Sequence, residues 1–228
     1  MVLISFDDIY ANESYSDEEK TIFRRIQNGN DSVLLTDYIV EALTKIIRGE
    51  NICCLGPGGT GKSTTQALCD YIYPSDKILR LAPTGTASLN MDPDKAKTIH
   101  SLFKIGEKSL LAYDWEKVKR QIRKNKEKIK EILDSTKLII IDEWSMIISG
   151  LFTTFILTIS MIYGNSSDMP TNNIQIVFMG DILQLPPVKN YDSPYINESS
   201  LFVNLRFILK FMILFLVIKF LKNILLNK

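Results

Sequence analysis

Short apolar runs alternate with longer polar and amphipathic stretches along the chain. Four such runs lie at residues 51–55, 78–81, 138–141 and 174–179, and each ends at a polar or glycine-rich turn. Continuous apolar runs of this length are typical of strands buried on both faces of a parallel sheet, with helices between them. The pattern predicts an α/β fold with a mostly parallel, doubly wound sheet flanked by helices.

Two helices are expected before the first of these strands. Ser16 precedes three acidic residues, as an N-cap precedes a first helical turn, which predicts a short helix near 17–28. From Thr36 onward apolar side chains recur at helical spacing, and Gly49 follows in the position that glycine favours after a helix.

The ends of the four predicted strands indicate where a ligand would bind. Gly56, Ala82, Asp142 and Gly180 are the residues that close the four runs. Ligands of doubly wound sheets bind beyond the carboxyl ends of the strands. We therefore expect the chemistry of the protein at these four positions.

The chain divides into three parts by composition. We expect an N-terminal helical segment at 1–34, one α/β domain at 35–200 and a hydrophobic, basic tail at 201–228. The tail has 20 apolar residues among 28, five basic residues and no acid. Its longest uncharged stretch, 211–218, is far shorter than the ~20 residues that span a bilayer. We interpret the tail as a buried or ill-formed helix, or as non-native sequence from a truncated gene, with a membrane segment as the disfavoured alternative.

Charge adds one local feature. The 27 Lys and Arg against 26 Asp and Glu give a net charge of +1, which argues neither for nor against an anionic partner. Residues 116–131 hold eight Lys or Arg and three Glu on a helical pattern. Such a run fits either a nucleic-acid-binding stripe or a solvated helix face, and the solvated face is the favoured interpretation.

The cysteines and the N-terminus both favour an intracellular protein. Cys53, Cys54 and Cys69 are odd in number and form no CxxC pair, which excludes a disulfide framework and a zinc site built from cysteines. A reducing compartment is the natural interpretation. The first 20 residues have no basic start and only a short apolar run, so no signal peptide is expected.

A phosphate-binding motif of the form GxxxxGK[ST] follows the first predicted strand and opens a helix, as such a motif requires. Its glycines allow backbone N–H groups to surround a phosphate chain, and Lys62 adds a positive charge on the β and γ oxygens of ATP. Ser63 would hold Mg²⁺ through its hydroxyl. The predicted cofactor-binding residues are Gly56, Pro57, Gly58, Gly59, Thr60, Gly61, Lys62, Ser63 and Thr64.

Two adjacent acids, Asp142 and Glu143, end the buried run at 138–141. A core strand would not tolerate paired carboxylates without a function. We expect Asp142 to contact the Mg²⁺ shell and Glu143 to orient and deprotonate the attacking water.

Four further segments narrow the class of P-loop protein. In order and spacing they resemble motifs Ia, Ib, II and III of the Pif (petite integration frequency) helicases. The segments are residues 81–90 (LAPTGTASLN), 98–103 (TIHSLF), 142–146 (DEWSM) and 180–188 (GDILQLPPV). The resemblance implies a RecA-like domain of a superfamily 1B, 5′-to-3′ ATP-dependent DNA helicase. It covers roughly residues 35–188.

The resemblance also implies roles for individual residues. Gln184 would reach the γ-phosphate and, with Lys62 and Glu143, complete the catalytic set. His100 is equally compatible with a core or capping role. The residues implied in contacts with single-stranded DNA are Thr84, Gly85, Thr86, Asn90 and His100.

The sequence departs from the family pattern at three places. Ile39 lies near the usual position of a glutamine that recognises adenine, Trp144 replaces a smaller apolar residue, and nothing after Val188 resembles a second RecA-like domain. We therefore expect a truncated helicase whose missing domain, with its arginine finger, comes from another chain or domain.

Alternatives remain open at this point. The chain could act as an ATP–Mg²⁺-binding module with little turnover, and a P-loop kinase or an AAA-type ATPase is less favoured. The resemblance implies DNA repair, recombination or telomere maintenance, in the nucleus or mitochondrion of a eukaryote or otherwise in the cytoplasm. A membrane partner is not expected.

Overall fold

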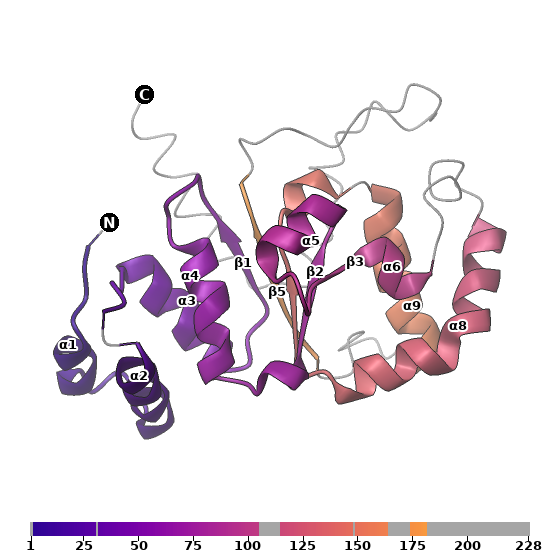
Figure 1. Cartoon of the computed structure of the whole chain (residues 1–228). Helices are drawn as coiled ribbons and strands as arrows, with labels where there is room; N and C mark the ends of the chain where they lie inside the picture. The colour runs from indigo at the N-terminus through magenta and orange to yellow at the C-terminus, as the bar shows by residue number, and fades with distance from the viewer. Residues whose placement is uncertain (1, 31, 105–114, 148, 164–173, 182–228) are drawn as a thin grey trace.

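The computed structural model describes residues 2–30, 32–104, 115–147, 149–163 and 174–181. A five-stranded sheet lies at the centre, in the order β1-β5-β4-β2-β3, and all of its strand pairs are parallel (Figure 1). The strands are β1 (Ile52–Leu55), β2 (Ile78–Ala82), β3 (Lys97–Thr98), β4 (Leu138–Ile141) and β5 (Gln175–Gly180). The predicted α/β fold with a parallel sheet is confirmed, and each of the four apolar runs is a strand to within one residue at its ends.

The strand register brings the carboxyl ends of the strands to one edge. Leu55 of β1 pairs with Gly180 of β5, and Ile141 of β4 pairs with Leu81 of β2. The backbone continues this alignment beyond the strands: the N–H of Gly56 donates to the carbonyl of Gly180 at 3.2 Å. The residues predicted to carry the chemistry therefore leave the sheet side by side.

Helices precede the sheet and cover it. They are α1 (Phe6–Ala11), α2 (Asp17–Gly29), α3 (Asp37–Ile47), α4 (Lys62–Leu68), α5 (Gly85–Met91), α6 (Ile99–Phe103), α8 (Trp115–Ser135) and α9 (Ser149–Tyr163), with 3₁₀ turns at Cys69–Tyr71, Ser75–Lys77 and Trp144–Met146. Ser16 caps α2 as predicted, and its hydroxyl and the Glu19 carboxylate form a reciprocal capping box. Thr36 caps α3, and Gly49 follows that helix with a φ of 76°.

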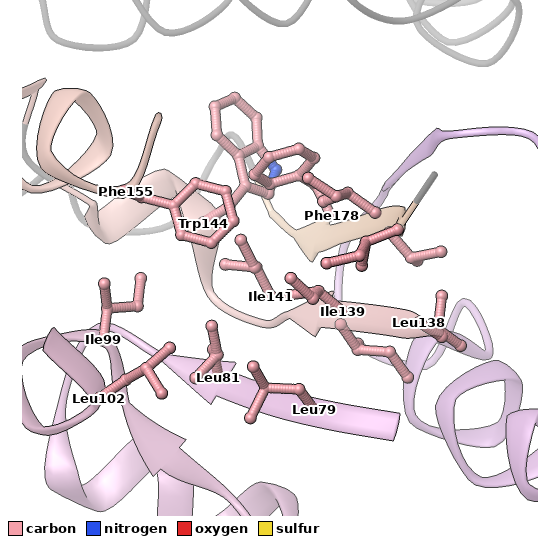
Figure 2. Close-up of a cluster of buried hydrophobic side chains, with 14 of the residues drawn as sticks. Leu79, Leu81, Ile99, Leu102, Leu138, Ile139, Ile141, Trp144, Phe155 and Phe178 are labelled. Atoms are coloured by element: carbon pink, nitrogen blue, oxygen red, sulfur yellow. The ribbon is translucent and has the colours of Figure 1, made fainter. Parts of the chain in front are cut away.

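The main core lies between the sheet and the helices α6, α8 and α9. The β4 side chains are fully buried, and α8 contributes an apolar stripe of Val118, Ile122, Ile129 and Leu133 to the same core. Figure 2 shows Leu79, Leu81 and Ile141 of the strands facing Ile99, Leu102 and Phe155 of the helices. This packing fixes the sheet whose edge carries the site.

A second core joins the N-terminal helices to α3. Ile9, Phe23, Ile26 and Leu43 are buried together with Leu68 of α4. The Arg48 guanidinium binds the Glu19 carboxylate at 2.7 Å, which ties the end of α3 to the start of α2. Helix α4, which carries Lys62 and Ser63 at the end of the phosphate motif, therefore shares its packing with residues before position 35. The division at residue 34 stays a prediction.

Other expectations concern the chain as a whole. Cys53, Cys54 and Cys69 are free thiols. In the part of the chain that the structure describes, no helix has the length and hydropathy needed to cross a membrane. The tail at 201–228 lies outside the described residues, so the interpretations of it stay predictions.

Candidate functional site

The loop between β1 and α4 has the shape of a phosphate cradle. Gly59 and Gly61 adopt φ values of 78° and 91°, in the left-handed region that glycine enters without steric cost. A Cβ atom added at Gly58 or Gly59 would meet nothing within 4 Å, so this side of the loop is open. α4 begins at Lys62, directly after the loop. The strand–loop–helix placement of the motif is as the sequence predicts.

The opposite side of the loop is closely packed. A Cβ atom at Gly61 would lie 2.8 Å from the side chain of Ile39, which is only 2% exposed. The Thr60 hydroxyl donates to the carbonyl of Pro57 at 2.9 Å and closes the turn. Ile39, which the sequence resemblance puts near the usual position of an adenine-recognising glutamine, thus packs against the loop and has no polar atom to offer a nucleotide base.

Lys62 is held within the loop by the backbone. Its ammonium group donates to the carbonyls of Gly56 at 2.6 Å and Pro57 at 2.9 Å. These carbonyls belong to the same loop that would surround a phosphate, so the positive charge is already located at the site. Ser63 is exposed and Thr64 half-buried in the first turn of α4.

The acidic pair leaves β4 beside β2. The N–H of Asp142 donates to the carbonyl of Leu81 at 2.9 Å, which continues the sheet by one residue. The Asp142 carboxylate accepts the N–H of Glu143 at 2.9 Å. Burial raises the pKa of Asp142, while that hydrogen bond and the charge of Lys62 act in the opposite direction.

Glu143 is the strained residue of the site. Its φ of 47° places a non-glycine residue in the left-handed region, which costs about 1–3 kcal/mol. Its Oε2 atom is buried and has no hydrogen-bond partner among the described residues. Burial raises the pKa of Glu143, and the nearby charges of Asp142 and Asp181 raise it further against the opposing effect of Lys62. A carboxylate in this state accepts a proton more readily than an exposed glutamate does.

Asp181 and Trp144 contribute to the site in ways the sequence interpretation missed. Asp181 follows β5, is 6% exposed and adds negative charge beside Glu143. The indole of Trp144 packs on Gly180, because a Cβ atom there would lie 2.7 Å from its Cδ1. The GD pair in residues 180–188 was a signal for Asp181, whereas no local signal pairs Trp144 with Gly180.

Four of the five predicted DNA-contacting residues lie on or next to one short helix. Thr84 caps α5 by accepting the N–H of Ala87 at 3.2 Å, and α5 follows the carboxyl end of β2. Thr84, Gly85, Thr86 and Asn90 are all exposed.

His100 stands apart from this group. It lies on α6 and is half-buried, and the capping role belongs to Thr98, whose hydroxyl accepts the N–H of Ser101 at 3.1 Å. Gln184 and the rest of 182–188 lie outside the described residues.

The residues at the carboxyl-terminal edge of the sheet fit a nucleoside triphosphate with Mg²⁺. The open glycine loop offers N–H groups, and Lys62 supplies a cation. The buried Oε2 of Glu143 has no hydrogen-bond partner among the described residues and could accept one from a bound water. Among the described residues no group of three His, Cys, Asp or Glu side chains could hold a metal alone. Mg²⁺ is usually bound by one or two carboxylates together with substrate phosphates, so a single Asp and a hydroxyl suffice here.

Comparison with known proteins bears on the family. A family model described as PIF1-like helicase matches residues 27–215, which is most of the chain. The chain belongs to the PIF1-like helicase family. The resemblance inferred from the motifs is thereby confirmed, and so is the RecA-like nature of the fold.

Individual PIF1-like relatives cover the same region. Protein 030L of Invertebrate iridescent virus 6 is 33% identical over 174 residues, which are 75% of this chain and 32% of the relative. The ATP-dependent DNA helicase PIF1 of Emericella nidulans is 34% identical over 157 residues, 66% of this chain and 20% of the relative. The chain thus spans about a third or less of these relatives.

A solved PIF1-like structure agrees with the fold. The crystal structure of the Pif1 helicase from Bacteroides in complex with ADP-AlF3 and ssDNA matches with a TM-score of 0.54 and 25% identity. The match covers 72% of this chain and 36% of that protein. That Bacteroides protein was solved with a nucleotide analogue and ssDNA in the same complex.

Proposed function

We propose that this chain is the first RecA-like motor domain of an ATP-dependent 5′-to-3′ DNA helicase. The observation that carries the proposal is the meeting of three elements at one sheet edge. The phosphate loop after β1, the acidic pair after β4 and the exposed α5 after β2 all leave parallel strands in matched register. An ATP site and a DNA-contacting helix on one rigid sheet are what coupling hydrolysis to movement on DNA requires.

The loop and α4 form the nucleotide-binding part of this proposal. Backbone N–H groups of the glycines would bind the phosphate oxygens. The Lys62 ammonium would leave the carbonyls of Gly56 and Pro57 and donate to the phosphate oxygens instead. Ser63 and Asp142 would hold Mg²⁺, which neutralises phosphate charge when it is bound. Ile39 presents no hydrogen-bonding atom, so recognition of the base falls to other residues.

Glu143 is the proposed general base. Its raised pKa and its unpartnered Oε2 suit a group that orients water and takes up its proton. Gln184, from the family resemblance, would complete the set by responding to the γ-phosphate.

DNA binding is assigned to the exposed end of α5. Thr84, Thr86 and Asn90 offer hydroxyl and amide groups, and Gly85 leaves room for a phosphate. His100 on α6 is a further candidate for contact with single-stranded DNA. The Bacteroides neighbour was solved with ssDNA, which supports this assignment.

A second function remains a candidate because the chain spans about a third or less of its relatives. On its own it would bind ATP–Mg²⁺ and single-stranded DNA but turn over slowly, since the charge-stabilising arginine is worth about 10³–10⁵ in rate. Another chain or domain would then supply the second RecA-like domain. The three free thiols support a location inside the cell.

DNA-stimulated ATP hydrolysis tests the proposal. The purified 228-residue chain is assayed alone and with a separately expressed second domain from a close relative, each with and without single-stranded DNA. We expect little hydrolysis alone and DNA-stimulated hydrolysis in the mixture. Hydrolysis that DNA never stimulates would contradict the motor assignment, and strand separation by the chain alone would contradict the need for a second domain.

A further inference from the structure

The positive charges of α8 are gathered in one half of the helix. We call residues 117–126 the basic half of α8; it holds six Lys or Arg and no acid. The rest of the helix, 127–135, has two Lys against three acids. A helix face that is merely solvated typically alternates the two signs, as the second half does.

The basic half turns its charge away from the core. Val118 and Ile122 are buried against the sheet layer, and the opposite face is exposed. Arg120, Arg123 and Lys124 are exposed. Arg123 and Lys124 lie three and four residues after Arg120, so both share its face of the helix. These like charges repel each other within the helix. Their side chains are not part of the core, so packing does not explain why they are there.

Arg120 and Arg123 lower the pKa of Glu116 less than Lys119 does, and neither of them forms an ion pair with it. Glu116 is engaged by Lys119 at 2.9 Å, and Asp134 in the second half is engaged by Lys130. In the described ranges of the chain, Arg120, Arg123 and Lys124 form no ion pair. The face therefore presents unpaired guanidinium and ammonium groups to an external anion.

The charge density of the basic half as a whole approaches that of a duplex. Ten helical residues extend about 15 Å, so six cations give roughly one charge per 2.5 Å. Duplex DNA carries one phosphate charge per about 1.7 Å of its axis. A straight helix with cations along one face can lie along such a backbone without reading the bases.

α8 packs against one of the two helices assigned to single-stranded DNA. α6, which holds His100, packs against α8, and Figure 1 shows α6 beside the N-terminal half of that helix. α5 and α6 carry the residues assigned to single-stranded DNA. The basic half of α8 therefore lies beside α6, with its exposed cations on the side of the helix that faces away from the core.

We propose that the basic half of α8 binds the phosphate backbone of the duplex that adjoins the single strand held at α5. The proposal rests on the proposed function for the position of the single strand. Arg120, Arg123 and Lys124 make the contacts through charge, independently of base sequence. For this half of the helix, the proposal takes the nucleic-acid-binding stripe rather than the solvated face, the two interpretations that the sequence left open.

Fluorescence anisotropy tests the proposal with two labelled probes: a duplex with a 5′ single-stranded tail, and the tail alone. The triple variant Arg120→Gln/Arg123→Gln/Lys124→Gln should bind the tailed duplex about tenfold more weakly, with a salt slope smaller by about 2–3. It should bind the tail alone as the wild-type chain does. A matched control, Lys20→Gln/Arg24→Gln/Arg25→Gln, removes the same charge from α2 and should leave both affinities unchanged.

The outcomes separate this proposal from the function itself. If the α8 variant behaves as wild type while Thr84→Ala/Thr86→Ala weakens binding of the tail, the α8 proposal fails and the proposed function stands. Equal weakening by the α8 and α2 variants, or wild-type binding of the tailed duplex no tighter than the tail, also overturns it. So does loss of binding to anionic phospholipid vesicles in the α8 variant with DNA binding unchanged, since the face would then serve a membrane.

Discussion

The loop after β1 and the turn after β4 leave the same edge of one sheet, and both contain left-handed backbone. In the loop the positive φ values fall on Gly59 and Gly61, where they cost little, and the Lys62 ammonium has backbone partners. In the turn the positive φ falls on Glu143, whose carboxylate keeps a buried oxygen without a partner among the described residues. The binding loop is relaxed, whereas the proposed catalytic turn is strained and incompletely satisfied.

This difference separates two tasks. A loop that only binds phosphate functions best when its geometry is already formed, since no binding energy is then used to order it. A general base needs a raised proton affinity and a fixed direction, and both follow from holding a carboxylate in a partly buried, strained turn. Changes in the loop should therefore affect affinity and stability, and changes in the turn should affect turnover.

The largest expected effect is on turnover. Glu143→Gln should lower DNA-stimulated ATP hydrolysis by about 10²–10⁴-fold, because the amide keeps the shape but cannot take up a proton. ATP affinity should stay within about threefold of wild type, since the phosphate contacts lie in the loop. Steady-state hydrolysis with the second domain present, together with nucleotide titration, measures both.

Asp142→Asn is the companion variant. It should weaken the Mg²⁺ dependence of nucleotide binding, whereas Glu143→Gln should not. Identical Mg²⁺ titrations for the two variants would show that the division of roles between these acids is wrong.

Next in size is the loss of nucleotide affinity in Lys62→Ala. Removing the ammonium should weaken ATP binding by about 10²-fold, because a charge-assisted contact to phosphate is lost. Thermal stability should change little, since the glycines rather than Lys62 set the shape of the loop, and the exposed carbonyl of Pro57 can bind water instead. Unchanged ATP affinity would contradict the phosphate site itself.

Substitutions of two glycines in the loop test, through the free energy of unfolding, how its left-handed backbone and its packing contribute to stability. Gly61→Ala should cost more than Gly59→Ala, because both place alanine at positive φ but only the first drives a Cβ to 2.8 Å from Ile39. We expect about 1 kcal/mol for Gly59→Ala and roughly twice that for Gly61→Ala. Equal free energies of unfolding in urea would mean that Ile39 yields to the added methyl.

The smallest effect is a pH dependence from Glu143. Its folded pKa is raised, so its ionisation opposes folding: the cost is absent at low pH and grows as pH rises above about 4.5, the ordinary value. Relative to Glu143→Gln, the wild-type protein should therefore lose stability as pH rises through this range. Melting temperatures of both proteins at several pH values check this, and parallel curves would mean that Glu143 titrates as an exposed residue does.

Much of the fold was predictable from local patterns. The four apolar runs became strands because their side chains suit burial on both faces, and Ser16 and Thr36 became N-caps because their hydroxyls satisfy helix N–H groups. β3 was missed because it is only Lys97 and Thr98, and its pairing with β2 depends on the chain around it. α9 was not predicted, since its mostly apolar sequence lacks a polar stripe.

The site divides in the same way. The glycine loop and Lys62 follow from a motif whose spacing encodes their geometry. Asp181 affects the pKa of Glu143 only because β4 and β5 lie side by side, and their paired residues are 37 positions apart in sequence. No local pattern reports this effect or the left-handed backbone of Glu143.

Gly180 carries a consequence for how this family of sequences can diverge. Its carbonyl accepts the N–H of Gly56, and its bare Cα faces the indole of Trp144. A side chain at 180 and a large ring at 144 compete for one volume, so a side chain is permitted at 180 only when the residue at 144 is smaller than tryptophan. Relatives with a smaller residue at the position of Trp144 have room for a larger one opposite, and the two positions should covary across an alignment of PIF1-like sequences.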